Sequence, residues 1–181
     1  STLLLLLMGA FSSFLLGIGM TVTAAYIFLA IVLAPALIQG GLDPMSVHLF
    51  ILYWGMLSFI TPPVALGAFA AASIAGSSAL STGFKAMRLG SIIYFIPFFF
   101  VLEPALIMEG SLLKTLTATL KVAIGIVLIA GTLQSYIIAI GFIDRPGSLG
   151  AAGRSLVIIG GGLIALPTTE VIGFNVGQVT L

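Results

Sequence analysis

Charged side chains are scarce in this sequence. Aspartate, glutamate, lysine and arginine make up only 6% of its 181 residues, against about 25% in an ordinary soluble domain. Hydrophobic residues make up 60%, and the mean hydropathy is +1.32. A soluble protein of this length cannot cover its surface with so few charges, so lipid must surround most of the chain. The composition therefore excludes an ordinary soluble globular domain.

Cysteine is absent, and histidine occurs once, as His48. Without cysteine the chain has no disulfide framework and no thiolate metal site, and His48 has no Asp, Glu or Cys at the spacing of a metal site. The net charge of +1 gives no basic face for nucleic acid. No nucleophile–base pair and no phosphate-binding loop is present. The sequence therefore gives no support for an enzyme, a structural metal ion or a cofactor.

The chain opens with Ser1-Thr2-Leu3 and continues directly into an apolar stretch. A signal peptide would begin with a basic region and end at a small-residue cleavage site, and neither is visible. We therefore expect a piece of a longer polypeptide.

Turn signals and charges divide the chain into five apolar blocks followed by a short polar tail. The blocks cover residues 3–39, 45–75, 84–108, 112–142 and 151–166, and the tail covers 167–181. A membrane-spanning helix needs about 20 apolar residues, so residues 84–108 and 112–142 are predicted to be simple spans. The fifth block is marginal, because Arg154 lies near its start and glycines 160–162 weaken its helix propensity.

The first two blocks are long, and each is interrupted near its middle. Residues 17–23 (GIGMTVT) interrupt the first block, and Thr61-Pro62-Pro63 interrupts the second. In hydrocarbon every backbone polar group must be paired, so non-helical backbone persists only where protein buries it or a cavity solvates it. The two interruptions are therefore the places where we expect a functional site.

Lysine and arginine indicate how the segments are oriented, because they collect on the cytoplasmic side of membrane proteins. Basic residues flank the loops near residues 80 and 147, whereas the loops near 42 and 109 are expected to lie outside. Residues 1–39 would then enter and leave the membrane from the outer side as a re-entrant hairpin. The alternative is two short spans joined by a cytoplasmic turn at residues 17–23, but that turn carries no lysine or arginine.

The first interruption offers backbone freedom and oxygen atoms. Gly17 and Gly19 permit backbone conformations that are closed to other residues, and Thr21 and Thr23 add hydroxyl oxygens. Half-helix ends with exposed carbonyls coordinate Na⁺ in secondary transporters, while half-helix N-termini attract anionic groups. The first interruption therefore predicts part of an ion or substrate site.

The second interruption has the same character. Pro62 and Pro63 lack N–H donors, which frees carbonyls one turn earlier, near Ser58 and Phe59, and Thr61 supplies a hydroxyl. Both interruptions hold oxygen donors and no charged side chain, which suits a hard monovalent cation. Either one alone is equally consistent with plain packing, because glycine often serves close contacts between membrane helices and proline kinks are common there. Two interruptions in neighbouring blocks favour a site.

Other candidate residues are weaker. His48 follows the outer loop, and we expect it to lie at the membrane interface. Glu103, before a proline, is a candidate intramembrane carboxylate, but it lies near an expected outer end. Tyr53, Trp54 and Tyr94 are expected to be interfacial or packing aromatics.

The interruptions also carry a resemblance to a known family. The matching segments are residues 17–26 (GIGMTVTAAY), 34–37 (APAL), 48–50 (HLF), 60–65 (ITPPVA), 75–76 (AG), 86–90 (AMRLG), 96–98 (IPF) and 104–106 (PAL). Their order and spacing hold from about residue 9 to 110. The chain resembles the large permease subunit of TRAP (tripartite ATP-independent periplasmic) transporters, and most of all the fused-permease branch that works with TAXI-type binding proteins.

The resemblance implies a sodium-driven importer of small organic anions with an elevator mechanism, with Na⁺ as coupling ion and no cofactor. In that family two inverted repeats each contribute a re-entrant hairpin and a broken helix. Residues 17–23 would be the tip of the second hairpin, and residues 61–63 the break of the second broken helix. The expected cation ligands are Gly17, Gly19, Thr23 and Thr61, and the expected substrate contacts are Thr21, Pro62 and Pro63.

We therefore predict an all-α, polytopic transmembrane protein of the bacterial inner membrane that holds the second repeat of an elevator-type transporter. Residues 1–110 would form the transport unit, with hairpin, broken helix and one span, and 111–181 an extension with one or two membrane segments. The expected partners are the upstream half of the same permease, a small membrane subunit or its fused equivalent, a periplasmic solute-binding protein and the lipid bilayer, but no nucleic acid. The alternative is a non-transporting membrane subunit that stabilises a partner permease; sodium dependence of substrate binding would separate the two.

Overall fold

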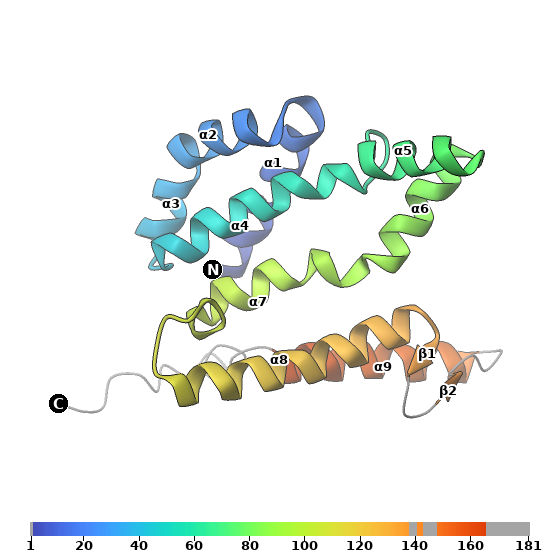
Figure 1. Ribbon diagram of the computed structural model, residues 1–181. Helices are drawn as coiled ribbons and strands as arrows, with labels where there is room; N and C mark the ends of the chain where they lie inside the picture. The colour runs from blue at the N-terminus through green and yellow to red at the C-terminus, as the bar shows by residue number, and fades with distance from the viewer. Residues whose placement is uncertain (1, 138–140, 143–147, 166–181) are drawn as a thin grey trace. The chain divides into compact units, whose positions relative to one another are not determined.

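The computed structural model describes residues 2–137, 141–142 and 148–165, and most of them are helical (Figure 1). The described strands are β1 (Tyr136–Ile137) and β2 (Gly141–Phe142), which form one short antiparallel ladder. The helical fold class predicted from the sequence is confirmed. The chain divides into two compact units, Ser1–Val101 and Leu102–Leu181.

The first unit opens with a helical hairpin. Helix α1 (Thr2–Gly19) is followed by a two-residue turn and then by α2 (Val22–Val32). Thr21 caps α2, because its hydroxyl accepts a hydrogen bond from the N–H of Ala24 at 3.3 Å. The chain therefore breaks inside the interruption predicted at residues 17–23. A short helix α3 (Ala34–Gln39) continues from α2.

Helix α4 (Pro44–Met56) starts at a strong cap. The carboxylate of Asp43 accepts a hydrogen bond from the N–H of Ser46 at 2.7 Å, and proline suits the first helical turn. A 3₁₀ turn, η1 (Leu57–Phe59), ends this helix, and α5 (Leu66–Ala75) begins after residues 60–65. The second interruption therefore lies where the sequence predicts it, since prolines 62 and 63 cannot donate the next helical hydrogen bonds.

The hairpin packs against α4, and this contact forms the core of the first unit. Helices α1 and α4 come close together at two glycines: a Cβ built on Gly17 would lie 2.5 Å from the carbonyl oxygen of Gly55. Such small residues let two helical backbones come together. The largest fully buried apolar side chains of this unit are Phe50, Leu6, Leu37, Ile51, Val47 and Val101.

The third apolar block is bent. Helix α6 (Ala79–Leu89) is followed by η2 (Ser91–Tyr94) and α7 (Ile96–Leu102), and the two arms meet at 68°. The simple span predicted for residues 84–108 is therefore wrong. The bend falls at Gly90, where a Cβ would lie 3.1 Å from the Cδ1 of Ile60. A glycine with low helix propensity thus lets the chain turn and press against the break between η1 and α5.

Side chains from the bent segment fill the space next to α4 and its break. Phe98 of α7 stacks edge-on with Phe50 and Trp54 of α4, with ring centroids 5.4 and 5.8 Å apart. Helix α6 passes Pro62 closely, because a Cβ on Gly83 would lie 2.8 Å from its Cγ. The third block therefore braces the interruption in the second.

The second unit is built on a pair of long helices. Helix α8 (Leu112–Leu133) covers most of the block predicted as a span at residues 112–142, and α9 (Ser148–Ala165) packs along it. Their backbones approach at Gly125, where a Cβ would lie 2.6 Å from the carbonyl oxygen of Gly161. Among the described residues, α8 is the one straight helix long and apolar enough to cross a membrane. Helix α9 offers the shorter apolar stretch Gly153–Ala165.

The segment that connects the two units packs against the second unit. Glu103 pairs with Lys114 of α8, with Oε1 and Nζ 3.4 Å apart, and the 3₁₀ turn η3 (Pro104–Ile107) packs on the same helix. Residues 102–110 therefore pack with the second unit, while the boundary of the transport unit at residue 110 stays a prediction. Glu103, expected as a candidate intramembrane carboxylate, is the acidic partner of this ion pair.

Candidate functional site

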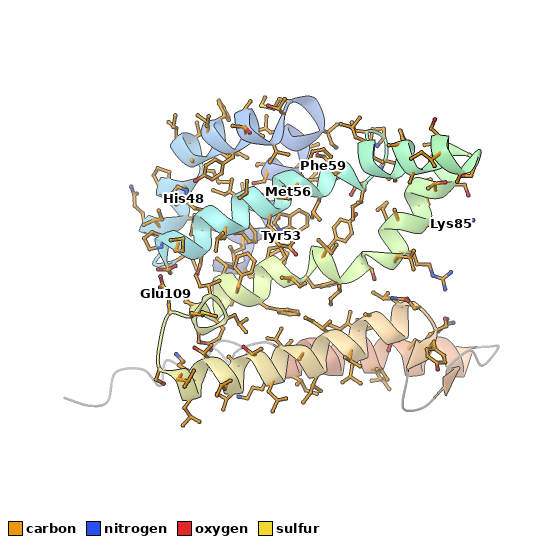
Figure 2. The ribbon with its side chains drawn as sticks, viewed as in Figure 1. His48, Tyr53, Met56, Phe59, Lys85 and Glu109 are labelled. Atoms are coloured by element: carbon orange, nitrogen blue, oxygen red, sulfur yellow. The ribbon has the colours of Figure 1, made fainter. Side chains whose placement is uncertain are left out.

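The first predicted interruption and residues that flank the second line one cavity of about 650 Å³ in the first unit. Residues 17–23, at the turn between α1 and α2, line one side of it. The other side is lined from the end of α4 to the start of α5 by Met56, Ser58, Phe59, Val64 and Leu66. Figure 2 shows Met56 and Phe59 along the last turns before the break. None of the lining side chains is charged, so backbone dipoles and hydroxyl groups set the electrostatics of this wall.

The end of α1 brings unpaired carbonyl groups to the cavity. The last helical hydrogen bond runs from the N–H of Met20 to the carbonyl of Leu16. Among the described residues, no donor is bonded to the carbonyls of Gly17, Ile18 and Gly19. A helix C-terminus carries a partial negative charge. This end of the cavity therefore favours a cation.

The end of η1 adds a second group of such carbonyls. The N–H groups of Ile60 and Thr61 both bond to the carbonyl of Leu57, and the two following residues are prolines without N–H groups. Within the part of the chain that the structure describes, the carbonyls of Ser58 and Phe59 receive no hydrogen bond. The free carbonyls expected from the proline pair are therefore present.

The same cavity also receives the starts of two helices. Helix α2 begins at Val22 and α5 at Leu66, and both residues line the cavity. The first turn of a helix leaves N–H groups without helical partners and carries a partial positive charge, which attracts anions. One cavity thus combines two helix ends that favour a cation with two that favour an anion.

The predicted site residues of the hairpin all line this cavity, but they differ in their surroundings. Gly17 is buried against Gly55, whereas a Cβ added to Gly19 would meet nothing within 4 Å. Thr21 uses its hydroxyl to cap α2. Thr23 is exposed, and its hydroxyl has no hydrogen-bond partner among the described residues. Thr23 is therefore the one of these two threonines whose hydroxyl oxygen is free.

The predicted residues of the broken helix do not line the cavity. Thr61 is 5% exposed, and its hydroxyl contacts the carbonyl oxygen of Leu57 at 2.7 Å and the hydroxyl of Tyr94 at 2.6 Å. Neither Thr61 nor the proline pair that follows it is among the lining residues. In this conformation Thr61 ties the break to η2, and Pro62 and Pro63 shape the backbone that presents the carbonyls.

Sequence reasoning alone missed two residues that position this site. Tyr94 was expected only as an interfacial or packing aromatic, yet its hydroxyl holds Thr61. His48, expected at the interface, lies with its Nδ1 3.1 Å from the hydroxyl of Tyr26, and the two rings meet edge-on. That contact joins α2 of the hairpin to α4. Both contacts join residues more than 20 positions apart, and no local sequence pattern signals them.

Comparison with known families decides what kind of protein carries this cavity. The family model of the tripartite ATP-independent periplasmic transporter, DctM component, matches residues 1–115. The chain belongs to this family. The matched region contains both interruptions, the cavity and the bent third block, so the resemblance noted in the sequence is confirmed. No curated protein and no solved structure matched the chain in the corresponding searches.

Membership in the DctM family makes the chain part of a TRAP transporter permease, and hence a membrane transport component. It assigns the first unit to the permease proper, because nearly all of the matched residues lie there. Residues 116–181, which include most of α8 and all of α9, lie beyond the match. The cavity therefore belongs to the transporter part of the chain.

Proposed function

We propose that this chain forms the second transport repeat of a sodium-coupled TRAP permease in the bacterial inner membrane. The permease would import small organic anions delivered by a periplasmic binding protein. The single observation that supports this proposal best is the uncharged cavity where the α1–α2 turn meets the break between η1 and α5. Such broken elements, placed face to face, are how inverted-repeat transporters build ion and substrate sites.

In this proposal the cation is held by oxygen atoms alone. The carbonyls at the end of α1 and those of Ser58 and Phe59 have no internal donors among the described residues, and the Thr23 hydroxyl faces the same cavity. Hard cations prefer such oxygen ligands, as Ca²⁺ and Mg²⁺ do, and an uncharged cage suits a monovalent ion better than a divalent one. Gly19 contributes its carbonyl, and its missing side chain leaves the approach open.

The anionic group of the substrate would lie against the helix starts. N–H groups in the first turns of α2 and α5 point toward the ends of those helices, and such groups bind carboxylates without a charged side chain. Thr21 and the proline pair would shape this part of the site. A cation bound nearby would strengthen the attraction for the anion, which gives a physical basis for coupling the two.

The lengths of the hairpin helices suit a re-entrant arrangement. Helix α1 has 18 residues and α2 has 11, or about 27 and 17 Å, and both belong to the shorter apolar helices of the described chain. A bilayer core is about 30 Å thick. A hairpin that enters and leaves on one side, with its turn at the cavity, uses both helices without forcing α2 to cross.

Sodium-driven uptake by the intact permease in liposomes, with its binding protein supplied, tests this function. Replacing Thr23 with valine removes one oxygen and keeps the shape of the side chain. We expect Thr23→Val to raise the sodium concentration for half-maximal uptake roughly tenfold, as expected for one lost contact to a charged group.

The matched control is Thr119→Val. Thr119 is also an exposed helical threonine with no side-chain hydrogen bond among the described residues, but it belongs to α8 and is not one of the residues that line the cavity. We expect its sodium dependence to match that of the parent. Uptake by the parent that does not depend on sodium would refute the proposed coupling. Uptake that does not need this chain at all would favour the non-transporting alternative.

A further inference from the structure

Lys121 lies near the middle of the one straight spanning helix. It is the tenth of the 22 residues of α8, so it lies about 13 Å from the start of a helix about 32 Å long. A bilayer core is about 30 Å thick. Lys114 lies seven residues earlier, nearly two turns closer to the helix start, and has Glu103 as its partner. Lysines near helix ends can extend to the interface, but Lys121 is placed much deeper.

No acidic group of the described chain neutralises Lys121. Its side chain is exposed, and it makes no ion pair or hydrogen bond with any described residue. The acidic residues that the structure describes are Asp43, Glu103 and Glu109, and all three lie in connections between helices. Among the described residues, therefore, no helix carries a carboxylate that could pair with Lys121.

The surface of α8 has one side for α9 and another suited to lipid. Helix α9 covers the side with Gly125, Leu128 and Ile129. An apolar side suited to lipid carries Leu113, Leu116, Leu120 and Val127, which are all more than half exposed. Lys114, Thr117 and Lys121 follow one another at spacings of three and four residues and form a polar flank. The flank is exposed and lies between the lipid side and the side that α9 covers, because Leu128, seven residues after Lys121 on the same stripe, lies against Gly161.

We propose that this polar flank docks on another membrane helix of the permease, outside these 181 residues, that carries an Asp or Glu opposite Lys121. Charge complementarity carries the inference, because charged side chains inside membranes face protein or water and pair with one another. The threonine on the same flank can share hydrogen bonds across such a helix contact. This surface goes beyond the proposed sodium-coupled transport and does not depend on it.

Lys121→Met in the intact permease tests the pairing, because the proposal predicts whether the melting temperature falls or rises. Methionine keeps much of the length and removes the charge. Removing one member of a buried ion pair leaves the other charge unpaired and destabilises the assembly. We expect the melting temperature of the purified permease to fall by about 3 °C or more, and Lys121→Arg to retain the parent value. Lys114→Met, which removes an exposed charge near the helix start, should shift it less.

Three further measurements identify the occupant. The fall in melting temperature caused by Lys121→Met should persist in nanodiscs of zwitterionic lipid. In the Lys121→Met background, neutralising the partner carboxylate on another membrane helix should restore the melting temperature. An unchanged or raised melting temperature for Lys121→Met would show that Lys121 faces lipid and would overturn the proposal. A loss seen only with anionic lipid would assign the contact to a lipid phosphate instead. The same loss in Glu170→Gln would assign it to the chain's own carboxylate, and either result would also overturn the proposal.

Discussion

Two glycines that look equivalent in the sequence have different roles in the structure. Gly17 and Gly19 are two residues apart in one interruption, and both were predicted as cation ligands. Gly17 is enclosed by the backbone of Gly55, whereas Gly19 has open space where a side chain would begin. Gly17 therefore combines a packing role with its place at the cavity, and Gly19 is free to serve the cavity alone.

Alanine substitutions separate these roles. Gly17→Ala should destabilise the permease by about 1–3 kcal/mol, because its Cβ would force α1 and α4 apart. Gly19→Ala should leave the melting temperature within error. Thermal unfolding of the purified variants measures both. Gly55→Ala is a second control, since a Cβ there meets nothing within 4 Å; equal losses in all three variants would contradict the proposed close contact.

Thr61 stays a predicted sodium ligand, and Tyr94 supplies its test. One lone pair of the Thr61 hydroxyl oxygen is occupied when Tyr94 donates to it. We expect Thr61→Ala to lower the apparent sodium affinity of uptake more than it lowers stability. Tyr94→Phe should leave that affinity unchanged or raise it, because the lone pair is freed.

The opposite result has a clear structural meaning. If both substitutions weaken sodium dependence equally, Thr61 acts by fastening the break to η2 through the bonds to Leu57 and Tyr94. Each variant would then lose about 1 kcal/mol of folding stability, the usual contribution of one hydrogen bond. Uptake at several sodium concentrations, paired with thermal unfolding, distinguishes the two.

At the scale of elements, interruptions were predictable where the residues enforce them. Consecutive prolines at 62 and 63 must end a helix, and the glycine- and threonine-rich segment 17–23 weakens one. The bend after α6 was not predicted, because a single glycine within an apolar run is tolerated in many helices. A side chain at Gly90 would crowd Ile60, because an added Cβ would lie 3.1 Å from its Cδ1. Such close packing between residues 30 positions apart has no local signature.

The orientation of these elements in the membrane stays a prediction with a direct test. The chain contains no cysteine, so single cysteines report their own location without background. Ser78→Cys, before α6, should react with a membrane-impermeant maleimide only from the cytoplasm, because Lys85 and Arg88 follow it. Met45→Cys, exposed at the start of α4, should react from outside. The reverse labelling pattern would invert the orientation and remove the argument for a hairpin entering from the outer side.

At the scale of the whole molecule, the cavity is lined by one hairpin turn and by residues beside the break of one helix. Sites in inverted-repeat transporters form where two repeats meet, each contributing such elements. The fold class and the family followed from composition and motif order, because both are spread over many residues. The cavity could be anticipated only as two separate interruptions, since their meeting depends on how the hairpin packs on α4.

We therefore expect residues 1–181 alone to insert into membranes without transporting. The unpaired carbonyls around the cavity would lack the protein that should face them, at several kcal/mol for each unsatisfied group in lipid. Reconstitution of these residues in liposomes, with a binding protein supplied, should give no sodium-driven uptake above protein-free vesicles. Robust uptake would show that the chain, alone or as a symmetric pair, completes the site by itself.

The uncharged wall of the cavity has a consequence for acidity. No residue lining it is ionisable. Peptide groups and aliphatic hydroxyl groups neither gain nor lose protons across the ordinary pH range. This wall would therefore present the same field in acidic and neutral surroundings. A change in external pH would act on the substrate itself, by altering how many of its acid groups are ionised. The charge of the cavity wall that contacts the substrate would stay constant.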